Sequence, residues 1–338
     1  MMMEKQRFIV TSALPYVNGV KHIGNIAGSL LPADVYARFL RLEGHDAIYV
    51  CGTDEHGAPT EIAALKAGES VEKFAEKNYE LQRRVYAGWN FSFDEFGRTS
   101  CKRNHETTRE MFEAMKKNGF ISERNLKMPY CRKDERFLPD RFIEGTCPTC
   151  GFDGARGDQC EKCGKVLDAH ELINPRCNVC GGKDIEFRDT RHLFLDLDKL
   201  QEKLQAWVST QVHWPANARN FALQWMKEGL KPRCITRDLK WGVKVPLAGF
   251  EDKVFYVWFD APIGYISFTQ EWAEKNGRNW EEYWRDDACR IVHFLGKDNV
   301  AFHTVIWPGM LLASGYARLP HMIRSYEFLN LEGRKFST

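Results

Sequence analysis

Short apolar runs and helical spacing alternate along the first fifty residues. Residues 7–13 (RFIVTSA) form an apolar run that leads into a segment with proline and glycine, which predicts a buried strand and a turn. Residues 25–42 show mostly helical spacing, which Pro32 interrupts and Gly44 is expected to end. Residues 47–51 (AIYVC) predict a second strand. Strand, helix and strand form a βαβ unit, whose ligands bind outside the carboxyl ends of the strands.

The rest of the chain divides into α/β stretches separated by an insertion. Helical spacing and apolar runs predict helices at residues 72–90, 102–118, 197–208 and 216–228, and strands at 253–259 and 289–295. Residues 122–188 lose helical periodicity and are rich in Gly, Pro, Asp and Cys. We therefore expect an α/β fold with a Rossmann-type parallel sheet, formed by residues 1–120 and 236–338 and split by a connective insertion of residues 121–235.

The charge balance excludes a general affinity for polyanions. Lys and Arg number 48 and Asp and Glu 46, giving a formal net charge of +2, so any contact with RNA must be local. The sequence has no signal peptide pattern, and no apolar run approaches the roughly 20 residues that span a bilayer. We expect a soluble, cytoplasmic protein with no membrane contact.

Cysteine spacing gives the strongest local signal. Six of the eleven cysteines form three Cys-x-x-Cys pairs between residues 147 and 180, which favours metal over disulfides. Zinc takes four tetrahedral thiolates, and the first two pairs supply them, each followed by a glycine that lets backbone amides turn towards sulfur. The expected ligands of this first cluster are Cys147, Cys150, Cys160 and Cys163. A redox dithiol or a pair of disulfides is the alternative.

The third cysteine pair needs partners to complete a second site. Cys177 and Cys180 form half a site, and Cys131 and Asp134 have the same spacing with a carboxylate in the second position. These four residues could bind a second zinc ion, although Asp is a less frequent structural ligand than Cys. Four protein ligands leave no open position, so we expect one or two structural zinc ions that do no chemistry.

The segment HIGN (22–25) raises the question of a phosphate site. It follows a predicted strand and opens a predicted helix, where free backbone N–H groups and the helix dipole favour an anion. Gly24 would let a phosphate approach the backbone, and His22 could donate to a phosphoryl oxygen. Alone, such a tetrapeptide is most often an incidental surface loop. Three distant segments match the same chemistry, however: LPYVN (14–18), GKD (296–298) and GRKFST (333–338).

From residue 8 to residue 338 the chain resembles the methionyl-tRNA synthetases, which are class I aminoacyl-tRNA synthetases. The resemblance rests on ALPYVNG (13–19), HIGN (22–25), GTDEHG (52–57), FLPDRF (137–142), the cysteine pairs, ITRD (235–238), YVWFDAPIGY (256–265), FLGKDNVAFH (294–303), WPGML (307–311) and KFST (335–338). The motifs stand in the family's order. The cysteine arrangement resembles archaeal and eukaryotic members more than common bacterial ones.

The resemblance implies activation of L-methionine by ATP to methionyl-adenylate, followed by transfer to the 3′ end of tRNA(Met). Attack of a carboxylate on the α-phosphate needs positioning and charge neutralisation, and Mg²⁺ is expected on the leaving pyrophosphate. The implied catalytic residues are His22, Asn25, Lys297, Lys335 and Arg237. The implied ATP-binding residues are His22, Gly24, Asn25, Gly296, Asp298 (at the ribose), Lys335 and Thr338.

The resemblance also implies a methionine pocket. Asp54 would hold the substrate ammonium. The other implied residues are Ala13, Leu14, Tyr16, Trp258, Ala261, Pro262, Tyr265, Asn299 and His303. Sulfur–aromatic contacts contribute on the order of 1 kcal/mol each, so size and shape must provide most of the discrimination, and homocysteine is a near-cognate competitor.

Each of these residues also has an ordinary interpretation. The aromatic residues, 13% of the chain, could be core packing, and residues 54–56 could be a solvated loop. The resemblance places Arg237 on the pyrophosphate side, yet it could pair with the adjacent Asp238.

The chain departs from the family pattern at three places. Asn25 replaces the second histidine of the signature, so it can donate a hydrogen bond but cannot carry a proton's charge. KFST (335–338) keeps only Lys335 of the usual two lysines, because Thr338 replaces the other. The family continues into a helical anticodon-binding domain, which is missing from this sequence. We expect a truncated or split enzyme with slow activation and weak tRNA selection.

Three other functions fit parts of the sequence. Another class I synthetase, for leucine, isoleucine, valine or cysteine, shares the signature motifs, but the insertion leaves little room for an editing domain. A non-catalytic zinc module that binds nucleic acid or a partner protein accounts only for the cysteines. A small-molecule nucleotidyltransferase has no need for the insertion or for residues 256–265.

Overall fold

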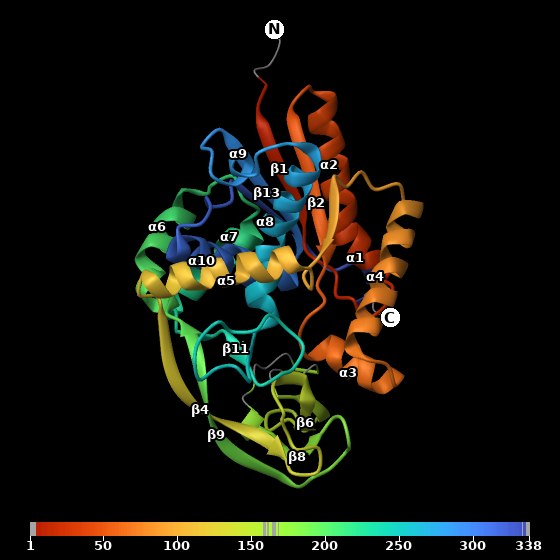
Figure 1. Cartoon of the computed structure of the whole chain (residues 1–338), viewed down its shortest axis with the longest axis vertical. Helices are drawn as coiled ribbons and strands as arrows, with labels where there is room; N and C mark the ends of the chain where they lie inside the picture. The colour runs from red at the N-terminus through yellow and green to blue at the C-terminus, as the bar shows by residue number, and fades with distance from the viewer. Residues whose placement is uncertain are drawn as a thin grey trace.

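A five-stranded parallel sheet forms the centre of the protein. The computed structural model describes residues 5–157, 160, 162–163, 167, 169–332 and 334–335. Within it the strand order is β14–β13–β1–β2–β3 (Figure 1). The strands are β1 (Arg7–Ser12), β2 (Asp46–Thr53), β3 (Glu95–Arg98), β13 (Cys289–Gly296) and β14 (Met322–Tyr326). The order reverses between β1 and β13, where a ligand crevice is expected at the carboxyl ends. The predicted α/β fold is confirmed.

A long helical segment follows each of the two central strands, and each contains a wide π-helical turn. After β1 come α1 (Ile23–Asn25), η1 (Ile26–Leu30) and α2 (Leu31–Leu42); after β13 come η5 (Lys297–Asn299), η6 (Phe302–Ile306) and α10 (Trp307–Ser314). Pro32 and Pro308 lie just after these turns. Because proline lacks an N–H and crowds the carbonyl four residues earlier, a wider turn accommodates it.

Most of the other predicted elements are confirmed. The remaining helical elements are α3 (Ala58–Ala67), α4 (Val71–Gly88), α5 (Lys102–Lys117), η4 (Leu197–Leu200), α6 (Gln201–Thr210), α7 (Ala216–Glu228), α8 (Val257–Asn276) and α9 (Glu281–Trp284). The strand predicted at 253–259 is wrong. Only β12 (Val254–Phe255) is extended, and it pairs with β11 (Thr236–Arg237) before α8 begins. The first part of α8 is buried on nearly all sides, so its apolar run resembles a buried strand.

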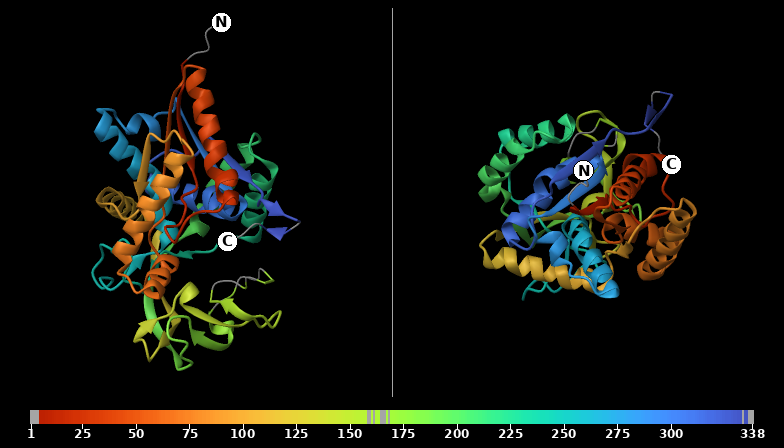
Figure 2. Two further views of the ribbon diagram at one scale, coloured as in Figure 1. Left: turned by 90° about the vertical axis from the view of Figure 1, so that its right-hand side faces the viewer. Right: turned by 90° about the horizontal axis from the view of Figure 1, so that it is seen from above.

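The insertion is a β structure held at the end of a long two-stranded ribbon. β4 (Ile121–Cys131) and β9 (Ile185–Leu195) pair along their full length and are flanked by β5 (Arg136–Phe137) and β10 (Arg233–Cys234). The ribbon reaches a small sheet on one side of the parallel sheet (Figure 2). That part contains η2 (Asp140–Phe142), β6 (Ile143–Thr146), β7 (Asp153–Arg156), η3 (Ala169–Glu171) and β8 (Ile173–Cys177). Near the end of the chain, β15 (Asn330–Leu331) pairs with β16 (Arg334–Lys335).

The buried residues form separate cores that match this division. Two apolar clusters include side chains of β1, β2 and β13, as a parallel sheet covered on both faces requires. A third cluster lies mainly in the insertion and includes the cysteines Cys131, Cys147, Cys160 and Cys177. Among the described residues, no helix combines the length and apolar character needed to cross a membrane.

Candidate functional site

A cavity of about 400 Å³ opens at the carboxyl ends of β1 and β13. Its wall contains all ten residues of the expected methionine pocket, together with His22, Gly24, Asn25, Gly296 and Asp298. The π-helical segments after the two strands carry residues to opposite sides of this cavity, including Gly28 and Ser29 from η1 and Phe302 and His303 from η6. The structure thus brings together residues that lie almost 290 positions apart in the sequence.

His22 caps the first helix and is held in one orientation. It lies immediately before α1 with extended backbone, and its Nδ1 accepts a hydrogen bond from the Gly24 N–H at 3.1 Å. A Cβ at position 24 would lie 2.8 Å from the imidazole Cε1, so only glycine fits under the ring. Because Nδ1 is the acceptor, the neutral imidazole carries its proton on Nε2. His22 is therefore arranged as a hydrogen-bond donor.

Gly296 and Asp298 form a second tight turn on the opposite wall. A Cβ at Gly296 would lie 2.7 Å from the Asp298 Oδ1, and the Asn299 side chain donates to the same oxygen at 3.2 Å. Lys297 points elsewhere and does not line the cavity. Its Nζ lies 2.6 Å from a carboxylate oxygen of Glu327, and that glutamate does line the cavity.

Asp54 is a buried carboxylate with an unsatisfied oxygen. The residue is 5% exposed, and among the described residues its Oδ1 has no hydrogen-bond partner. Burial raises the pKa of Asp54 well above its usual value, the neighbouring Asp260 and Glu55 add to the rise, and Lys21 opposes it. The backbone N–H of His56 donates to this carboxylate. An ammonium group entering the cavity would supply the missing partner.

Residues 54–56, which follow β2, are buried, so the alternative of a solvated loop is wrong. Glu55 and His56 are fully buried beside Asp54. Arg98 pairs with the Glu55 carboxylate at 2.9 Å, and the His56 Nδ1 lies 2.7 Å from the Asp260 Oδ2. These buried pairs fix the backbone of residues 55 and 56 and therefore the position of Asp54 beside them.

Polar atoms of the aromatic wall satisfy one another. The Trp258 Nε1 donates to the Tyr16 hydroxyl at 2.7 Å. The His303 Nδ1 lies 3.0 Å from the Asn299 carbonyl and must donate to it, so Nε2 accepts from the Tyr265 hydroxyl at 2.9 Å. Burial lowers the pKa of His303 to about 4, which keeps the ring neutral near pH 7. With these groups paired, the wall can receive an unbranched apolar chain.

Sequence reasoning missed several cavity residues. Lys21 lines the cavity, its Nζ donates to the Asn18 Oδ1 at 2.6 Å, and burial lowers its pKa to about 8 against the attraction of Asp54. Phe302, Glu327 and Phe328 also line it. Phe302 lies inside a quoted motif and could have been found by its place beside His303. Positions 327 and 328 follow β14 and carry no sequence signal.

The first cysteine cluster has the geometry of a tetrahedral thiolate site. The Sγ atoms of Cys147 and Cys163 are 3.9 Å apart, and those of Cys150 and Cys160 are 3.7 Å apart. Four sulfurs at 2.3 Å from one zinc ion would be separated by about 3.8 Å. Disulfide sulfurs lie near 2.05 Å, and all of these cysteines are free. The four residues fit a zinc ion, and none of them is joined in a disulfide.

The second cluster brings the two expected half-sites together. The Sγ atoms of Cys131 and Cys180 lie 3.7 Å apart, and the Cys177 Sγ lies 3.0 Å from the Asp134 Oδ2. All four ligand atoms lie within 4.8 Å of one another. Backbone N–H groups point at three of the sulfurs, which is how thiolates are stabilised at such turns. The donor set therefore also fits a zinc ion.

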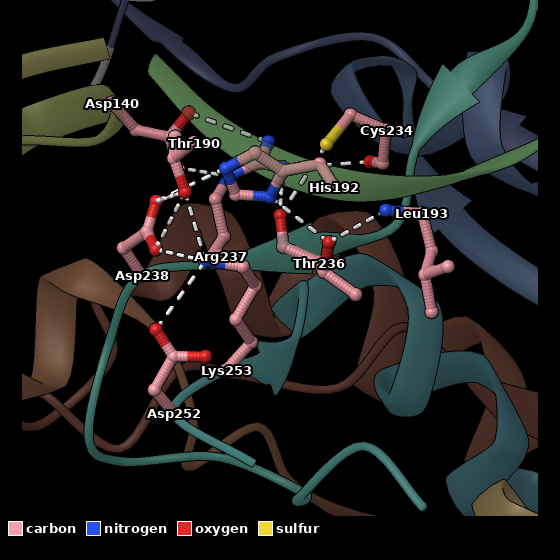
Figure 3. A network of polar contacts seen from close by, with 10 residues as sticks. All are labelled: Asp140, Thr190, His192, Leu193, Cys234, Thr236, Arg237, Asp238, Asp252 and Lys253. Carbon is pink, nitrogen blue, oxygen red and sulfur yellow. Dashed lines mark hydrogen bonds and ion pairs between the residues drawn. The ribbon is translucent and has the colours of Figure 1, made fainter. Parts of the chain in front are cut away.

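Arg237, another predicted catalytic residue, is not among the residues that line the cavity. Arg237 pairs with Asp140 at 2.9 Å, whereas Asp238 pairs with His192 and Lys253 (Figure 3). The predicted alternative of an Arg237–Asp238 pair is therefore wrong, because the two side chains have different partners. The backbone of Lys335 lies in β16. The Lys335 side chain and Thr338 lie outside the described part of the structure, as does Gly164 after the fourth cysteine.

Comparison with known proteins places the chain in one family. The family described as tRNA synthetases class I (M) matches residues 8–338. A methionine–tRNA ligase of Acaryochloris marina is 52% identical over 334 residues, which cover 98% of this chain and 60% of the relative. The corresponding ligase of Caulobacter vibrioides is 50% identical over 343 residues, with 98% and 60% covered. The chain thus spans about 60% of the length of these relatives.

A solved structure shows the same fold. The Mycobacterium tuberculosis methionyl-tRNA synthetase bound by methionyl-adenylate superposes with a TM-score of 0.74 at 29% identity, over 96% of this chain and 58% of that one. These relatives are bacterial, so the predicted archaeal and eukaryotic character is not supported. On the match over residues 8–338, the chain belongs to the class I (M) family of tRNA synthetases.

Proposed function

We propose that this chain carries the amino-acid-activating site of a methionine–tRNA ligase, which joins L-methionine and ATP to give methionyl-adenylate and pyrophosphate. The observation that carries the proposal is Asp54, a buried carboxylate with an unsatisfied oxygen at the edge of an aromatic cavity. The relatives' names and the methionyl-adenylate bound to the Mycobacterium tuberculosis enzyme support it.

The amino-acid half of the proposed site recognises charge at one end and shape at the other. Asp54 would accept hydrogen bonds from the methionine ammonium, which restores a partner to its buried oxygen. The thioether chain would lie against Ala13, Leu14, Tyr16, Trp258, Ala261, Pro262, Tyr265 and His303. Because the Tyr265 hydroxyl and the His303 Nε2 are paired with each other, neither is left to bind a hydroxyl group of a competitor, and the shape of the wall must exclude branched chains.

The nucleotide half of the proposed site lies between the two glycine turns. His22 would donate from Nε2 to a phosphoryl oxygen, with Gly24 and Asn25 beside it at the start of the helix. Asp298 would hold the ribose over Gly296. Lys297, Lys335 and Thr338 belong to this proposal as phosphate-side groups, with Mg²⁺ on the leaving pyrophosphate. Lys297 would first have to leave Glu327.

Within this proposal, the chain's residues act by positioning. The methionine carboxylate attacks the α-phosphorus in line with the leaving pyrophosphate, and no protein nucleophile is required. Holding both substrates in one cavity makes this attack effectively unimolecular, which lowers its barrier. Asn25 can orient a phosphate oxygen but takes no part in proton transfer.

The proposal extends to the insertion and to the second reaction step. Residues 121–235 would form a connective domain built on two structural zinc ions, held by the two cysteine clusters. The second step would be methionyl transfer to tRNA, which the relatives' names imply, and we propose tRNA(Met) as the acceptor and the cytoplasm as the compartment.

The experiment that tests the proposal is ATP–pyrophosphate exchange with a panel of amino acids. Methionine should support exchange, homocysteine should do so weakly, and leucine, isoleucine, valine and cysteine should not. Exchange driven best by another member of the panel would assign the site to a different class I synthetase.

A further inference from the structure

The turn η2 contains a residue in a strained backbone conformation. Asp140 has φ +52°, in the left-handed region that residues other than glycine seldom adopt. The Gly157 N–H donates to the Asp140 carbonyl at 3.1 Å, and a Cβ at Gly157 would lie 2.8 Å from that oxygen. The surrounding structure therefore enforces the strained conformation. Such strain is concentrated at functional positions.

The strained turn directs the Asp140 carboxylate at Arg237. Its two oxygens lie 2.9 Å from Nε and 3.4 Å from Nη2 of the guanidinium (Figure 3). Burial alone would lower the pKa of Arg237, but the neighbouring Asp140 raises it, so the guanidinium stays charged. The arginine also lies 4.0 Å above the ring of Tyr256, within the range of a cation–π interaction.

Tyr256 connects this pair to the cavity. It is the residue just before α8, and its N–H donates to the Ile235 carbonyl at 2.9 Å. The first turns of α8 carry Trp258, Ala261, Pro262 and Tyr265 into the cavity wall. Trp258, two residues after Tyr256, donates a hydrogen bond to the Tyr16 hydroxyl of the same wall at 2.7 Å. The position of Arg237 therefore affects the start of α8, which forms part of the wall that would contact methionine.

The backbone next to Arg237 is fixed independently. The Asp238 Oδ2 lies 3.0 Å from the His192 Nε2, and Lys253 and Thr190 also contact this carboxylate (Figure 3). These partners come from β9 and from the segment before β12. The Arg237 Nη1 donates to the Thr236 and Cys234 carbonyls at 2.9 and 3.4 Å, and the salt bridge to Asp140 orients Nε and Nη2.

The other face of the turn is tied to the second cysteine cluster. Asn178 lies between Cys177 and Cys180, its N–H donates to the Phe142 carbonyl at 2.8 Å, and its Nδ2 donates to the Arg141 carbonyl at 3.0 Å. Asn178 thus lies in the cysteine turn of the second cluster and donates two hydrogen bonds to the η2 turn. Its location depends on how the flanking cysteines are held.

We propose that Asn178 and Asp140 are positioning residues that couple the second metal cluster to the methionine cavity through Arg237 and Tyr256. This inference rests on the proposed function for its kinetic consequence. The proposal gives the second zinc site a structural role. The filled cluster would fix Asn178 and so the η2 turn, and Asp140 in that turn would orient Arg237 against Tyr256 at the start of α8.

The first test compares two variants with matched controls. Asp140→Asn and Asn178→Ala should each raise the KM for methionine in ATP–pyrophosphate exchange about tenfold, with little change in the KM for ATP. The first variant loses the charge-assisted contact with Arg237, and the second loses the side-chain hydrogen bond to the η2 turn. The control for Asp140 is Asp153→Asn, which breaks an exposed pair with Arg176 in the same small sheet. The control for Asn178 is Thr149→Ala, an exposed residue between the cysteines of the first cluster.

Two further measurements separate positioning from folding and from metal loss. Zinc content by mass spectrometry should equal that of the wild type in all four variants. Amide hydrogen exchange should quicken in residues 256–265 for Asp140→Asn and Asn178→Ala but not for the controls. In an Arg237→Gln background, Asp140→Asn should change the KM less than twofold, because the two residues act through one interaction.

The proposal is overturned if Asp140→Asn behaves like Asp153→Asn, or if the double variant shows additive losses. Absence of methionine-dependent exchange in the zinc-loaded wild type would instead reject the proposed function. In that case the hydrogen-exchange comparison still decides whether the cluster and the start of α8 are coupled.

Discussion

At the scale of single residues, the site is defined by a few groups whose surroundings force them into one state. His303 is kept neutral by burial, His22 is kept as a donor by the Gly24 N–H, and Asp54 is left with an unsatisfied oxygen. Each state suits the proposed substrate: an apolar chain, a phosphate and an ammonium group, respectively.

Asp54→Asn should raise the KM for methionine about a hundredfold and leave the KM for ATP unchanged. The substitution removes the negative charge opposite the ammonium but keeps the side chain's size, and a hydrogen bond between charged groups is worth about 1.5–3 kcal/mol. Steady-state exchange kinetics measure this. Asp252→Asn, at an exposed surface position, is the control. An equal rise in both KM values would point to misfolding rather than to lost ammonium binding.

Methionine binding should weaken as pH falls. The ammonium needs an ionised Asp54, and burial raises the pKa of that carboxyl in the free protein, with Asp260 and Glu55 adding to the rise. Protonation therefore sets in at a higher pH than for an ordinary aspartate, and affinity is lost on the acidic side. Isothermal titration across a pH series measures this. The Asp54→Asn variant should bind weakly without the same pH dependence, and an identical slope in both proteins would contradict the assignment.

At the scale of elements, the carboxyl ends of β1 and β13 and the π-helical segments after them build the cavity. Motif spacing predicted this placement because parallel strands end on one side of a sheet. The spacing could not show that Lys297 turns to Glu327, or that Arg237 pairs with Asp140, since both partners come from distant elements. The error at residues 253–259 has a similar cause, because a helix buried on all sides has the same pattern as a buried strand.

Gly24→Ala should lower the exchange rate at least tenfold while the fold is retained. The new methyl group would lie 2.8 Å from the His22 ring, which must then rotate and lose its hydrogen bond to the backbone at position 24. Gly88→Ala, in α4 with open space around the position, is the matched control for adding a methyl group to a helix. Circular dichroism checks the fold. Unchanged activity in Gly24→Ala would show that His22 does not act from this orientation.

At the scale of the whole molecule, a parallel sheet carries the cavity, and a distant β insertion carries both cysteine clusters. The cysteine pairs predicted the two groups of side chains because two ligands three positions apart on one turn supply half of a tetrahedral site. The contact between the insertion and the start of α8 had no such signal, since it depends on the backbone of a short turn. The long β4–β9 ribbon carries β6 and β8 away from the parallel sheet (Figure 1), and the η2 turn reaches β11 through the Asp140–Arg237 salt bridge.

Purified protein should contain two zinc ions per chain. Asp134→Ala should remove one ion, because the second cluster loses its fourth ligand, and Cys150→Ala should remove the other. Each loss should lower the melting temperature, since structural zinc binding is coupled to folding. Metal analysis and calorimetry measure both effects. Full zinc content in the Asp134→Ala variant would exclude that carboxylate as a ligand.

The most direct test of the account is single-turnover formation of methionyl-adenylate, followed with labelled methionine in the wild type and in Asp54→Asn. We predict that the wild type forms the adenylate in a reaction requiring both ATP and methionine, and that Asp54→Asn forms it only at far higher methionine concentrations. Equal rates in the two proteins at low methionine, or adenylate formed more readily from another amino acid, would contradict the proposed site.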